Sequence, residues 1–295
     1  MFLQPPPKPP IKSPLNYTGG KFKLVGALRW HFPDNIKTFV DLFAGGLNVT
    51  LNIEAQKYIV NDRLHFLIDL FKHLREIGAE SAVLGVESIV ERYGLSKTSK
   101  EGYLKLRRDF NLSEKKDPLI FFSLIAHAFN YQIRFNGRHE FNMPFGKGKC
   151  DFSSTMRANL IAMCENLQRK EIAFMSEDFR SVDLSGMGEE DFLYCDPPYL
   201  ITTATYNDGK RGFGGWGEES ERALYRILDG AHNRGVRFAL SNVIVAGGKE
   251  NEMLREWSSA YRVIELKGRF SHFRKGEGSK GEGEVLIVNY PHKYD

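Results

Sequence analysis

The stretch "TFVDLFAGGLNVTLNIEAQKYIVND", residues 38–62, decides the fold. Its two apolar runs, 38–43 and 57–62, have the length and composition of buried strands. Glycines mark a turn after the first run, and the apolar residues of 47–55 recur at a spacing compatible with a helix. Strand, glycine turn, helix and strand make a βαβ unit, which predicts a parallel sheet.

The rest of the chain repeats this alternation after an interruption. Amphipathic segments such as 63–78 fill the block from about 64 to 150, which ends in a polar stretch, 136–149, expected to be a loop or hairpin. Beyond 155 we expect helices at 154–168, 218–235 and 249–259, and strands at 172–178, 191–196, 237–243, 261–266 and 284–290. The pattern predicts an α/β core formed by residues 1–64 and 156–295, with a mainly helical domain inserted at 65–155.

Composition indicates an ordered globular protein of one or two domains. The 295 residues are 42% hydrophobic and 13% aromatic. The longest apolar run, 119–129, is too short to cross a bilayer. The proline-rich start, 1–12, has no apolar core of a signal peptide, so we expect an extended tail and a cytoplasmic protein. Three scattered cysteines predict neither a disulfide framework nor a metal site.

The distribution of basic residues is more informative than the net charge of +4. Basic groups are interleaved with aromatic and glycine residues at 105–110, 133–149 and 267–283, a mixture that suits a phosphate backbone and stacked bases. Solvated loop charges explain each stretch about equally well. The glycine-rich part, 274–283, is expected to be a mobile hairpin loop that orders or contacts phosphate when a nucleic acid binds, or only a flexible turn.

A nucleoside-bearing cofactor is favoured by two features of the first βαβ unit. The turn "DLFAGG", 41–46, lets a ligand approach the backbone at the carboxyl edge of a parallel sheet, although it matches neither GxGxxG nor a Walker A loop. Asp62 ends the next strand, where it can accept hydrogen bonds from ribose hydroxyls or merely cap a helix. Asp178 falls on the same edge, and Phe179 either lies against an adenine ring or packs in the core.

The segment "YCDPPYL", 194–200, carries the chemistry. Its prolines end the strand at Asp196, because proline lacks the donor that a sheet ladder needs. The Asp196 carboxylate and the Pro197 carbonyl can hold both N–H groups of a planar exocyclic amine, so that the nitrogen attacks a sulfonium methyl. Tyr199 can stack on a base rotated out of the duplex. A plain strand-to-turn stop is the alternative.

Four stretches together resemble a known family: "SPLNYTGGK" (13–21), "FVDLFAGG" (39–46), "IRFNGRHEFNMPFGK" (133–147) and "YCDPPYL" (194–200). They resemble the Dam-type (D12 class, alpha group) adenine-N6 DNA methyltransferases, and the segment 96–111 resembles the T-even phage members in particular. The resemblance implies a Rossmann-like class I methyltransferase sheet with an inserted target-recognition domain. It also implies S-adenosylmethionine as methyl donor, and a flipped-out adenine within GATC in double-stranded DNA as acceptor.

The expected site residues follow from these motifs. The predicted catalytic group is Asp196, Pro197, Pro198 and Tyr199. The predicted cofactor contacts are Tyr17, Lys21, Asp41, Phe43, Gly45, Asp62, Asp178, Phe179 and Asp196. The predicted DNA contacts are Arg107, Phe129, Asn130, Gln132, Arg134, Asn136, Pro144 and Lys147. Arg134 can bind guanine O6 and N7 in the major groove, or form a surface salt bridge.

Two departures from the family pattern and several alternatives stay open. Leu47 stands where the FxGxG cofactor motif has its second glycine, and Gly148 stands where some members carry a tyrosine. Alternatives are a methylase of a longer related site, a cytosine-N4 or RNA adenine methylase, and a catalytically idle DNA-binding regulator. A cognate restriction endonuclease in the same system, without direct contact, and a monomer or weak dimer are further expectations.

Overall fold

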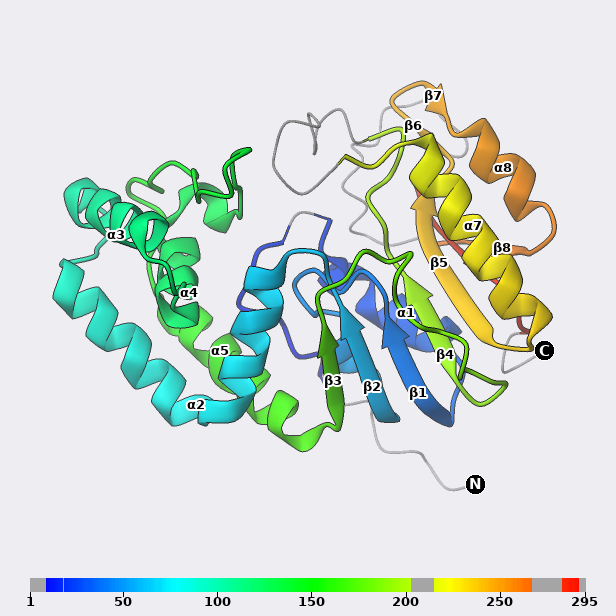
Figure 1. Ribbon diagram of the computed structural model, residues 1–295, viewed down its shortest axis with the longest axis horizontal. Helices are drawn as coiled ribbons and strands as arrows, with labels where there is room; N and C mark the ends of the chain where they lie inside the picture. Colours follow the sequence, from blue (N-terminus) through cyan, green and yellow to red (C-terminus); the bar gives the residue numbers. More distant parts are fainter. Residues whose placement is uncertain (1–8, 18, 203–214, 267–282, 292–295) are drawn as a thin grey trace.

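The computed structural model describes residues 9–17, 19–202, 215–266 and 283–291. Within them a seven-stranded sheet forms the centre of the molecule (Figure 1), in the order β3-β2-β1-β4-β5-β9-β8. The five strands from β3 to β5 run parallel, whereas β9 is antiparallel to both of its neighbours. The strands are β1 (Ile36–Asp41), β2 (Ala55–Asn61), β3 (Ile172–Met175), β4 (Phe192–Cys195), β5 (Arg237–Val243), β8 (Arg262–Glu265) and β9 (Glu284–Val288).

This mainly parallel sheet confirms the predicted α/β class and puts a crevice at the middle of its carboxyl edge. From β1 the chain passes to β2 on one side, whereas β4 pairs with β1 on the other side. In open α/β sheets, ligands bind at such a switch point, outside the carboxyl ends of the strands. The strands that carry "DLFAGG" and "YCDPPYL" are therefore neighbours, although about 150 residues separate them in the sequence.

The predicted helix at 47–55 is wrong. The connection between β1 and β2 holds only a short 3₁₀ turn, Thr50–Asn52. The side chain of Asn52 binds the backbone of Ile11, and the side-chain oxygen of Asn48 accepts from the backbone N–H of Ser13. These contacts with the N-terminal segment replace the hydrogen bonds that a helix would make, because asparagine side chains compete well for backbone groups.

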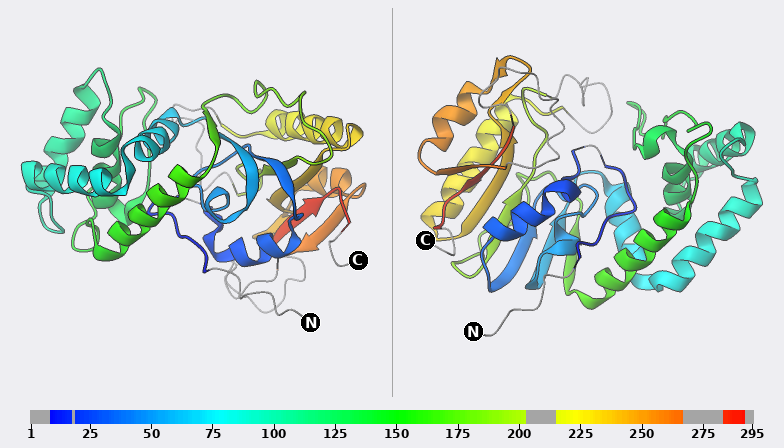
Figure 2. Two further views of the ribbon diagram at one scale, coloured as in Figure 1. Left: turned by 90° about the horizontal axis from the view of Figure 1, so that it is seen from below. Right: turned by 180° about the vertical axis from the view of Figure 1, so that it is seen from behind.

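Helices cover both faces of the sheet (Figure 2). One face packs on α1 (Val25–His31), which follows the 3₁₀ turn Lys21–Leu24, and on parts of α2 and α5 (Ser154–Arg169). The other face packs on α7 (Glu218–Asn233) and α8 (Glu252–Ser258). Along β4, Phe192 and Tyr194 point to the first face, and Leu193 and Cys195 to the second. Burial on both faces explains why this strand reads as a continuous apolar run.

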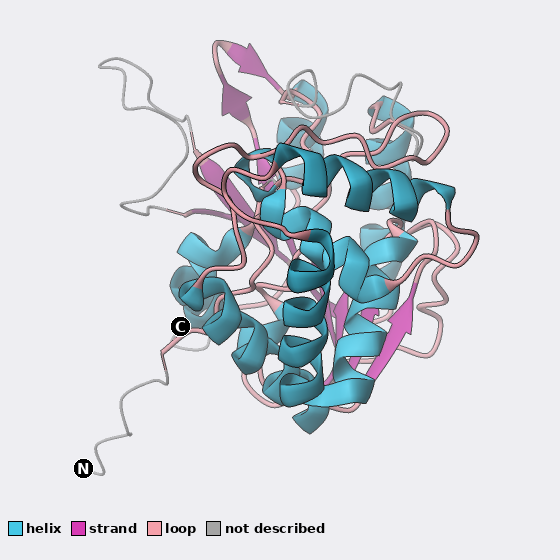
Figure 3. Ribbon diagram, turned by 90° about the vertical axis from the view of Figure 1, so that its left-hand side faces the viewer, coloured by secondary structure: helices cyan, strands magenta, loops and turns pink. Residues whose placement is uncertain are grey.

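The helices of the inserted part lie beside the strands of the sheet (Figure 3), and the long helix α2, labelled in Figure 1, joins the two parts. Helix α2 (His65–Tyr93) is interrupted at Gly78, whose φ of 75° lies in the left-handed region. Before the break, Arg75 donates to the backbone oxygens of Lys170 and Ile172, at the start of β3. After the break, α2 packs with α3 (Lys100–Leu112) and α4 (Pro118–His127). One hydrophobic core runs from the sheet into these helices.

Two of the three helices expected after residue 153 are present at their expected positions. The helices expected at 154–168 and 218–235 are α5 and α7, whereas residues 249–250 of the third expected helix form strand β7 (Lys249–Glu250), which pairs with β6 (Val245–Ala246). In the described ranges, no helix has the length and apolar character needed to cross a bilayer. Most of the expected proline-rich tail and of the 274–283 hairpin loop lies outside the described residues.

Candidate active site

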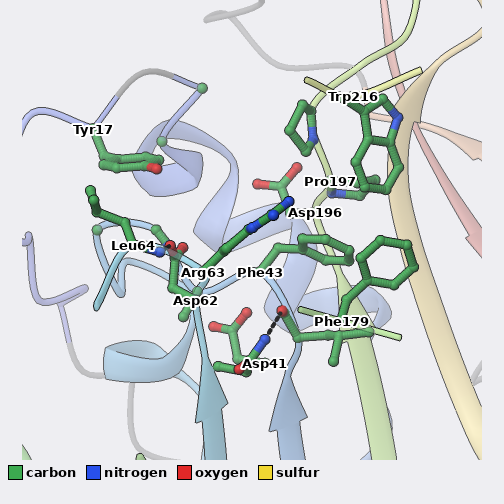
Figure 4. A pocket seen from close by; sticks show the side chains of 18 of the residues that line it. Tyr17, Asp41, Phe43, Asp62, Arg63, Leu64, Phe179, Asp196, Pro197 and Trp216 are labelled. Carbon is green, nitrogen blue, oxygen red and sulfur yellow. Dashed lines mark hydrogen bonds between the residues drawn. The ribbon is translucent and has the colours of Figure 1, made fainter. Parts of the chain in front are cut away.

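A cavity of about 420 Å³ lies at the carboxyl edge of β1, β2 and β4 (Figure 4). Its walls come from the N-terminal segment, the segments that follow β1, β2, β3 and β4, the loop around 133–135 and the residues at the start of α7. Thirteen of the predicted residues line it: Tyr17, Lys21, Asp41, Phe43, Gly45, Asp62, Arg134, Asp178, Phe179, Asp196, Pro197, Pro198 and Tyr199. The structure therefore brings the predicted cofactor and catalytic residues into one cavity.

Asp62 joins the ends of two neighbouring strands. Its Oδ2 accepts from the backbone N–H of Gly45 at 2.8 Å, and its Oδ1 accepts from the N–H of Leu64 at 2.8 Å. Burial raises the pKa of Asp62, and these two N–H groups partly offset the rise. Gly45 has a φ of 48°, and a Cβ there would lie 2.9 Å from the ring of Tyr17. Turn, carboxylate and aromatic ring are thus closely fitted.

Asp41 is a buried carboxylate at the end of β1. Its Oδ2 accepts from Thr50 Oγ1 at 2.6 Å, while its Oδ1 has no hydrogen-bond partner among the described residues. Burial raises its pKa to about 7, and repulsion from Asp196 and Asp62 adds to the rise. Asn61, at the end of β2, donates to the carbonyls of Leu42 and Glu177 and so fixes the turn beside Asp41.

An aromatic wall closes one side of the cavity. The rings of Phe43 and Phe179 lie 5.3 Å apart, and Trp216 contacts both, at 5.6 and 5.4 Å between centroids. Arg180 lies over the ring of Phe179, and Asp178 pairs with Arg180 and Arg63. Phe179 is therefore packed in the core and also lines the cavity. Its contact with an adenine ring stays a prediction.

Asp196 is held by two side chains at the end of β4. Lys21 Nζ lies 2.8 Å from Asp196 Oδ1, and the Tyr199 hydroxyl donates to the same oxygen at 3.2 Å. Lys21 is only 3% exposed and lies over the Tyr199 ring, 5.0 Å from its centroid. Burial raises the pKa of Asp196 to about 6, although Lys21 lowers it. Lys21, predicted as a cofactor contact, is here a partner of the predicted catalytic carboxylate.

Arg134 reaches the same cavity from the inserted helical part. Its Nε and Nη2 donate to the side-chain and backbone oxygens of Asn142, both at 2.8 Å. The next residue, Phe135, stacks on Phe66 at 4.6 Å, just beyond the Asp62 turn. Among the residues that the structure describes, Arg134 is therefore held by Asn142 and not by an acidic partner in a surface salt bridge.

The other predicted DNA residues fall into two groups. Phe129 is 50% exposed, Pro144 and Lys147 are exposed, and Gln132 is half-buried. Asn130 is exposed, and its carbonyl accepts from Asn16 Nδ2 at 2.8 Å, which ties the loop to the N-terminal segment. These side chains stay predicted DNA contacts.

Arg107 and Asn136 shape the loop from inside. Arg107 Nη1 donates to the carbonyl of Met143 at 2.9 Å. Asn136 Oδ1 accepts from the N–H groups of Arg138 and Glu140, and closes the turn at the tip of the loop. Both residues therefore hold the backbone in place, a role that the sequence did not predict.

The residues of this site that were not predicted from the sequence include Trp216, Arg63 and Glu284. Trp216 lines the cavity in front of α7, and Arg63 extends across it from the Asp62 side (Figure 4). Glu284, the first residue of β9, lies 3.7 Å from Lys21 Nζ through its Oε2. A tryptophan just before a helix is a weak local signal, and an acidic residue at the start of a strand is weaker still. Only the tertiary structure brings them here.

The sequence matches a family of known proteins along most of its length. A sequence model of the family "D12 class N6 adenine-specific DNA methyltransferase" matches residues 17–272. The type II methyltransferase M.FokI of Planomicrobium okeanokoites is 42% identical over 280 residues, which are 95% of this chain and 43% of that protein. The modification methylase StsI of Streptococcus sanguinis is 42% identical over 285 residues, 96% of this chain and 43% of that protein.

A shorter relative matches along nearly its whole length. The DNA adenine methylase of Escherichia coli (strain K12) is 27% identical over 281 residues, which cover 94% of this chain and 95% of that protein. The chain therefore spans less than half of the first two relatives but almost all of the third.

Proposed function

Because the chain belongs to the D12 class of N6 adenine-specific DNA methyltransferases, we propose that it transfers a methyl group to N6 of an adenine in duplex DNA. The cofactor of this family is S-adenosylmethionine, as the sequence predicted. One observation carries the proposal: the Asp196 carboxylate and the Asp62–Gly45 turn face one cavity. An amine acceptor and a nucleoside-bearing donor can therefore meet there.

The cavity fits the cofactor by the chemistry of its walls. Asp62 presents a carboxylate beside a glycine turn, which suits ribose hydroxyls. The wall of Phe43, Phe179 and Trp216 offers flat apolar surface for an adenine ring. The Oδ1 of Asp41, unpartnered within the described residues, is a further buried acceptor. When bound, S-adenosylmethionine supplies an electrophilic methyl group.

The DPPY segment would act on the amine. Asp196 and the Pro197 carbonyl accept the two N–H groups, which favours the tetrahedral nitrogen of the transition state over the planar one. Lys21 and the Tyr199 hydroxyl hold the Asp196 carboxylate in place for this. The Tyr199 ring would stack on the target base, which must leave the duplex to reach the cavity.

We propose residues 65–155 as the target-recognition domain, with residues 1–64 and 156–295 as the catalytic domain. Arg134 extends from the recognition domain to the catalytic cavity, so that a base pair read by Arg134 lies next to the flipped adenine. A bidentate guanidinium contact reads guanine in the major groove. We propose GATC as the site, with a longer related site as the alternative.

The proposed substrate, an adenine in duplex DNA, determines which partners we expect. Double-stranded DNA is the proposed partner, and relatives named as modification methylases support a cognate restriction endonuclease encoded in the same system. A monomer or weak dimer acting in the cytoplasm remains our expectation.

The direct test is methyl transfer from labelled S-adenosylmethionine to duplexes with and without GATC. We expect label on adenine N6 in the GATC duplex, and a single-turnover rate that Asp196→Asn lowers by at least about 10²-fold. Asp183→Asn is the matched control, because Asp183 is an exposed loop aspartate that accepts from Ser185 N–H. No label in any duplex would refute the proposal.

Analysis of the modified nucleoside separates the alternatives. N4-methylcytosine, or label found only in RNA, would identify one of the other two amine methylases. DNA binding without any transfer would identify a catalytically idle regulator.

A further inference from the structure

One buried ammonium group at this cavity, that of Lys21, lies near two carboxylates. Lys21 Nζ lies 2.8 Å from Asp196 Oδ1 and 3.7 Å from Glu284 Oε2. The three side chains are 3%, 18% and 11% exposed, so water screens these charges weakly. The family motifs account for Lys21 and Asp196, whereas nothing assigns a role to Glu284.

Glu284 reaches the site because of the direction of its strand. Strand β9 is antiparallel to β5, so its first residue lies at the edge where the parallel strands end. Glu284 is in register with Val243, the last residue of β5, and its carbonyl accepts from Leu266 N–H at 2.9 Å. Its Oε2 is buried and makes no hydrogen bond within the described part of the chain, so Lys21 is its ionic partner there.

The proposed methyl transfer calls for a second negative charge beside the Lys21 ammonium. This argument rests on the proposed function. The N6 lone pair forms a bond to the methyl carbon, and the carbon–sulfur bond breaks with its electron pair left on sulfur. N6 is then positively charged and must release one proton. The Asp196 carboxylate, which accepts the N–H groups, is the nearest base and becomes neutral when it takes that proton.

Neutral Asp196 would remove the nearest negative charge from the Lys21 ammonium, which also donates to the Gly19 carbonyl at 2.9 Å. An unpaired charge in a buried site is strongly unfavourable. The Glu284 carboxylate, whose Oε2 lies 3.7 Å from Lys21 Nζ, remains as a partner of the ammonium during this step. We propose that Glu284 is a positioning residue of the methyl transfer, which holds the Lys21 side chain in place while Asp196 accepts the proton from the substrate amine.

The neighbouring groups agree with this assignment. The titratable side chains that face Asp196 and Glu284 in the described residues are Lys21, Asp41, Tyr194, Cys195 and Tyr199. Burial raises the pKa of the two tyrosines and of the cysteine thiol, so these three stay neutral at neutral pH. Among those side chains Lys21 is the only cation. Lys21 lowers the pKa of Asp196, whereas the nearby Glu284 raises it.

The test is the titration of Asp196 in wild-type protein and in Glu284→Gln. The Asp196 carboxyl carbon is followed by ¹³C NMR in aspartate-labelled protein and assigned with Asp196→Asn. Single-turnover methyl transfer to duplex DNA is measured across the same pH range. In Glu284→Gln we expect the titration midpoint and the acid limb of the rate to move to lower pH, and the rate at neutral pH to fall about tenfold.

Two further variants separate this effect from a general loss of structure. Glu284→Asp keeps the charge, and should return the midpoint toward that of the wild type. Glu190→Gln removes an exposed carboxylate before β4, at the opposite edge of the sheet, and should change neither measurement.

The outcomes are distinguishable. A midpoint unchanged in Glu284→Gln would overturn the role of Glu284, whether or not the protein is active. Equal loss of rate in Glu284→Gln and Glu284→Asp, with the wild-type midpoint in both, would also overturn it. Wild-type protein that methylates no duplex would refute the proposed function, while the NMR titration would still decide whether Glu284 acts on Asp196.

Discussion

The backbone N–H of Gly45 donates to the carboxylate of Asp62 at 2.8 Å, and this contact joins the turn after β1 to the end of β2. The same carboxylate accepts from Leu64 N–H, at the beginning of α2. Asp62 therefore has two tasks. It fixes the turn through these two bonds, and its remaining lone pairs face the cavity.

Replacing Asp62 by asparagine should loosen the turn and weaken cofactor binding. An amide group puts an NH₂ opposite one of the two backbone N–H donors, which loses a charge-assisted hydrogen bond of about 1–3 kcal/mol. We expect the Kd for S-adenosylmethionine, measured by calorimetry, to rise at least about tenfold. Asp183→Asn, in an exposed loop, should leave the Kd unchanged. Equal affinities of Asp62→Asn and wild type would contradict the assignment.

Gly45→Ala should destabilise the fold. The new Cβ would lie 2.9 Å from the Tyr17 ring at a backbone φ of 48°, so the ring must move and the backbone is strained. We expect the free energy of unfolding in urea to fall by about 1–3 kcal/mol. Gly26→Ala, in α1, has no atom within 4 Å of the added Cβ and should be neutral or slightly stabilising.

Arg134→Ala should reduce specificity more than activity. Loss of a bidentate base contact lowers discrimination by about 1–3 kcal/mol, so kcat/KM for the cognate duplex should approach that for a duplex with one changed base pair. Arg138→Ala is the matched control, because Arg138 is exposed on the same loop and pairs with Glu140. If both variants kept wild-type discrimination, Arg134 would not read the DNA.

Stability should fall as pH rises through the titration of Asp41. Its pKa is about 7 in the folded chain and roughly 3.9 in the unfolded chain. Between these values the folded state holds more protons, so the free energy of unfolding decreases with increasing pH, by roughly a few kcal/mol. Asp41→Asn should flatten this slope in urea unfolding measured from pH 4 to 8. Asp183→Asn should keep the wild-type slope.

The sequence predicted those parts of the fold whose pattern is local. Phe192 to Cys195 form an unbroken apolar run because both faces of β4 are covered, and the prolines that follow end the strand. The carboxyl ends of parallel strands share one edge, so strand order along the chain was enough to place Asp41, Asp62 and Asp196 together. These predictions needed only strand periodicity and proline chemistry.

The errors and omissions come from contacts between distant segments. Apolar spacing in 47–55 suits a helix, but Asn48 and Asn52 bind residues 35 to 41 positions earlier in the chain. Periodicity identifies the strand 284–290 but not its direction, and the antiparallel direction is what brings Glu284 to Lys21. No local pattern contains that information.

The break at Gly78 has a practical consequence for engineering. A Cβ at Gly78 would lie 2.8 Å from the side-chain amide of Gln168, near the end of α5, so the chain leaves the sheet and returns to it at adjacent points. If the segment from Gly78 to Gln168 were replaced by that of a relative, its two junctions would be in contact. Leu67, Phe71 and Leu74 would stay in the core of the host protein. Such junctions should yield folded hybrids with new DNA specificity more often than cuts at 64 and 155, which remove those side chains.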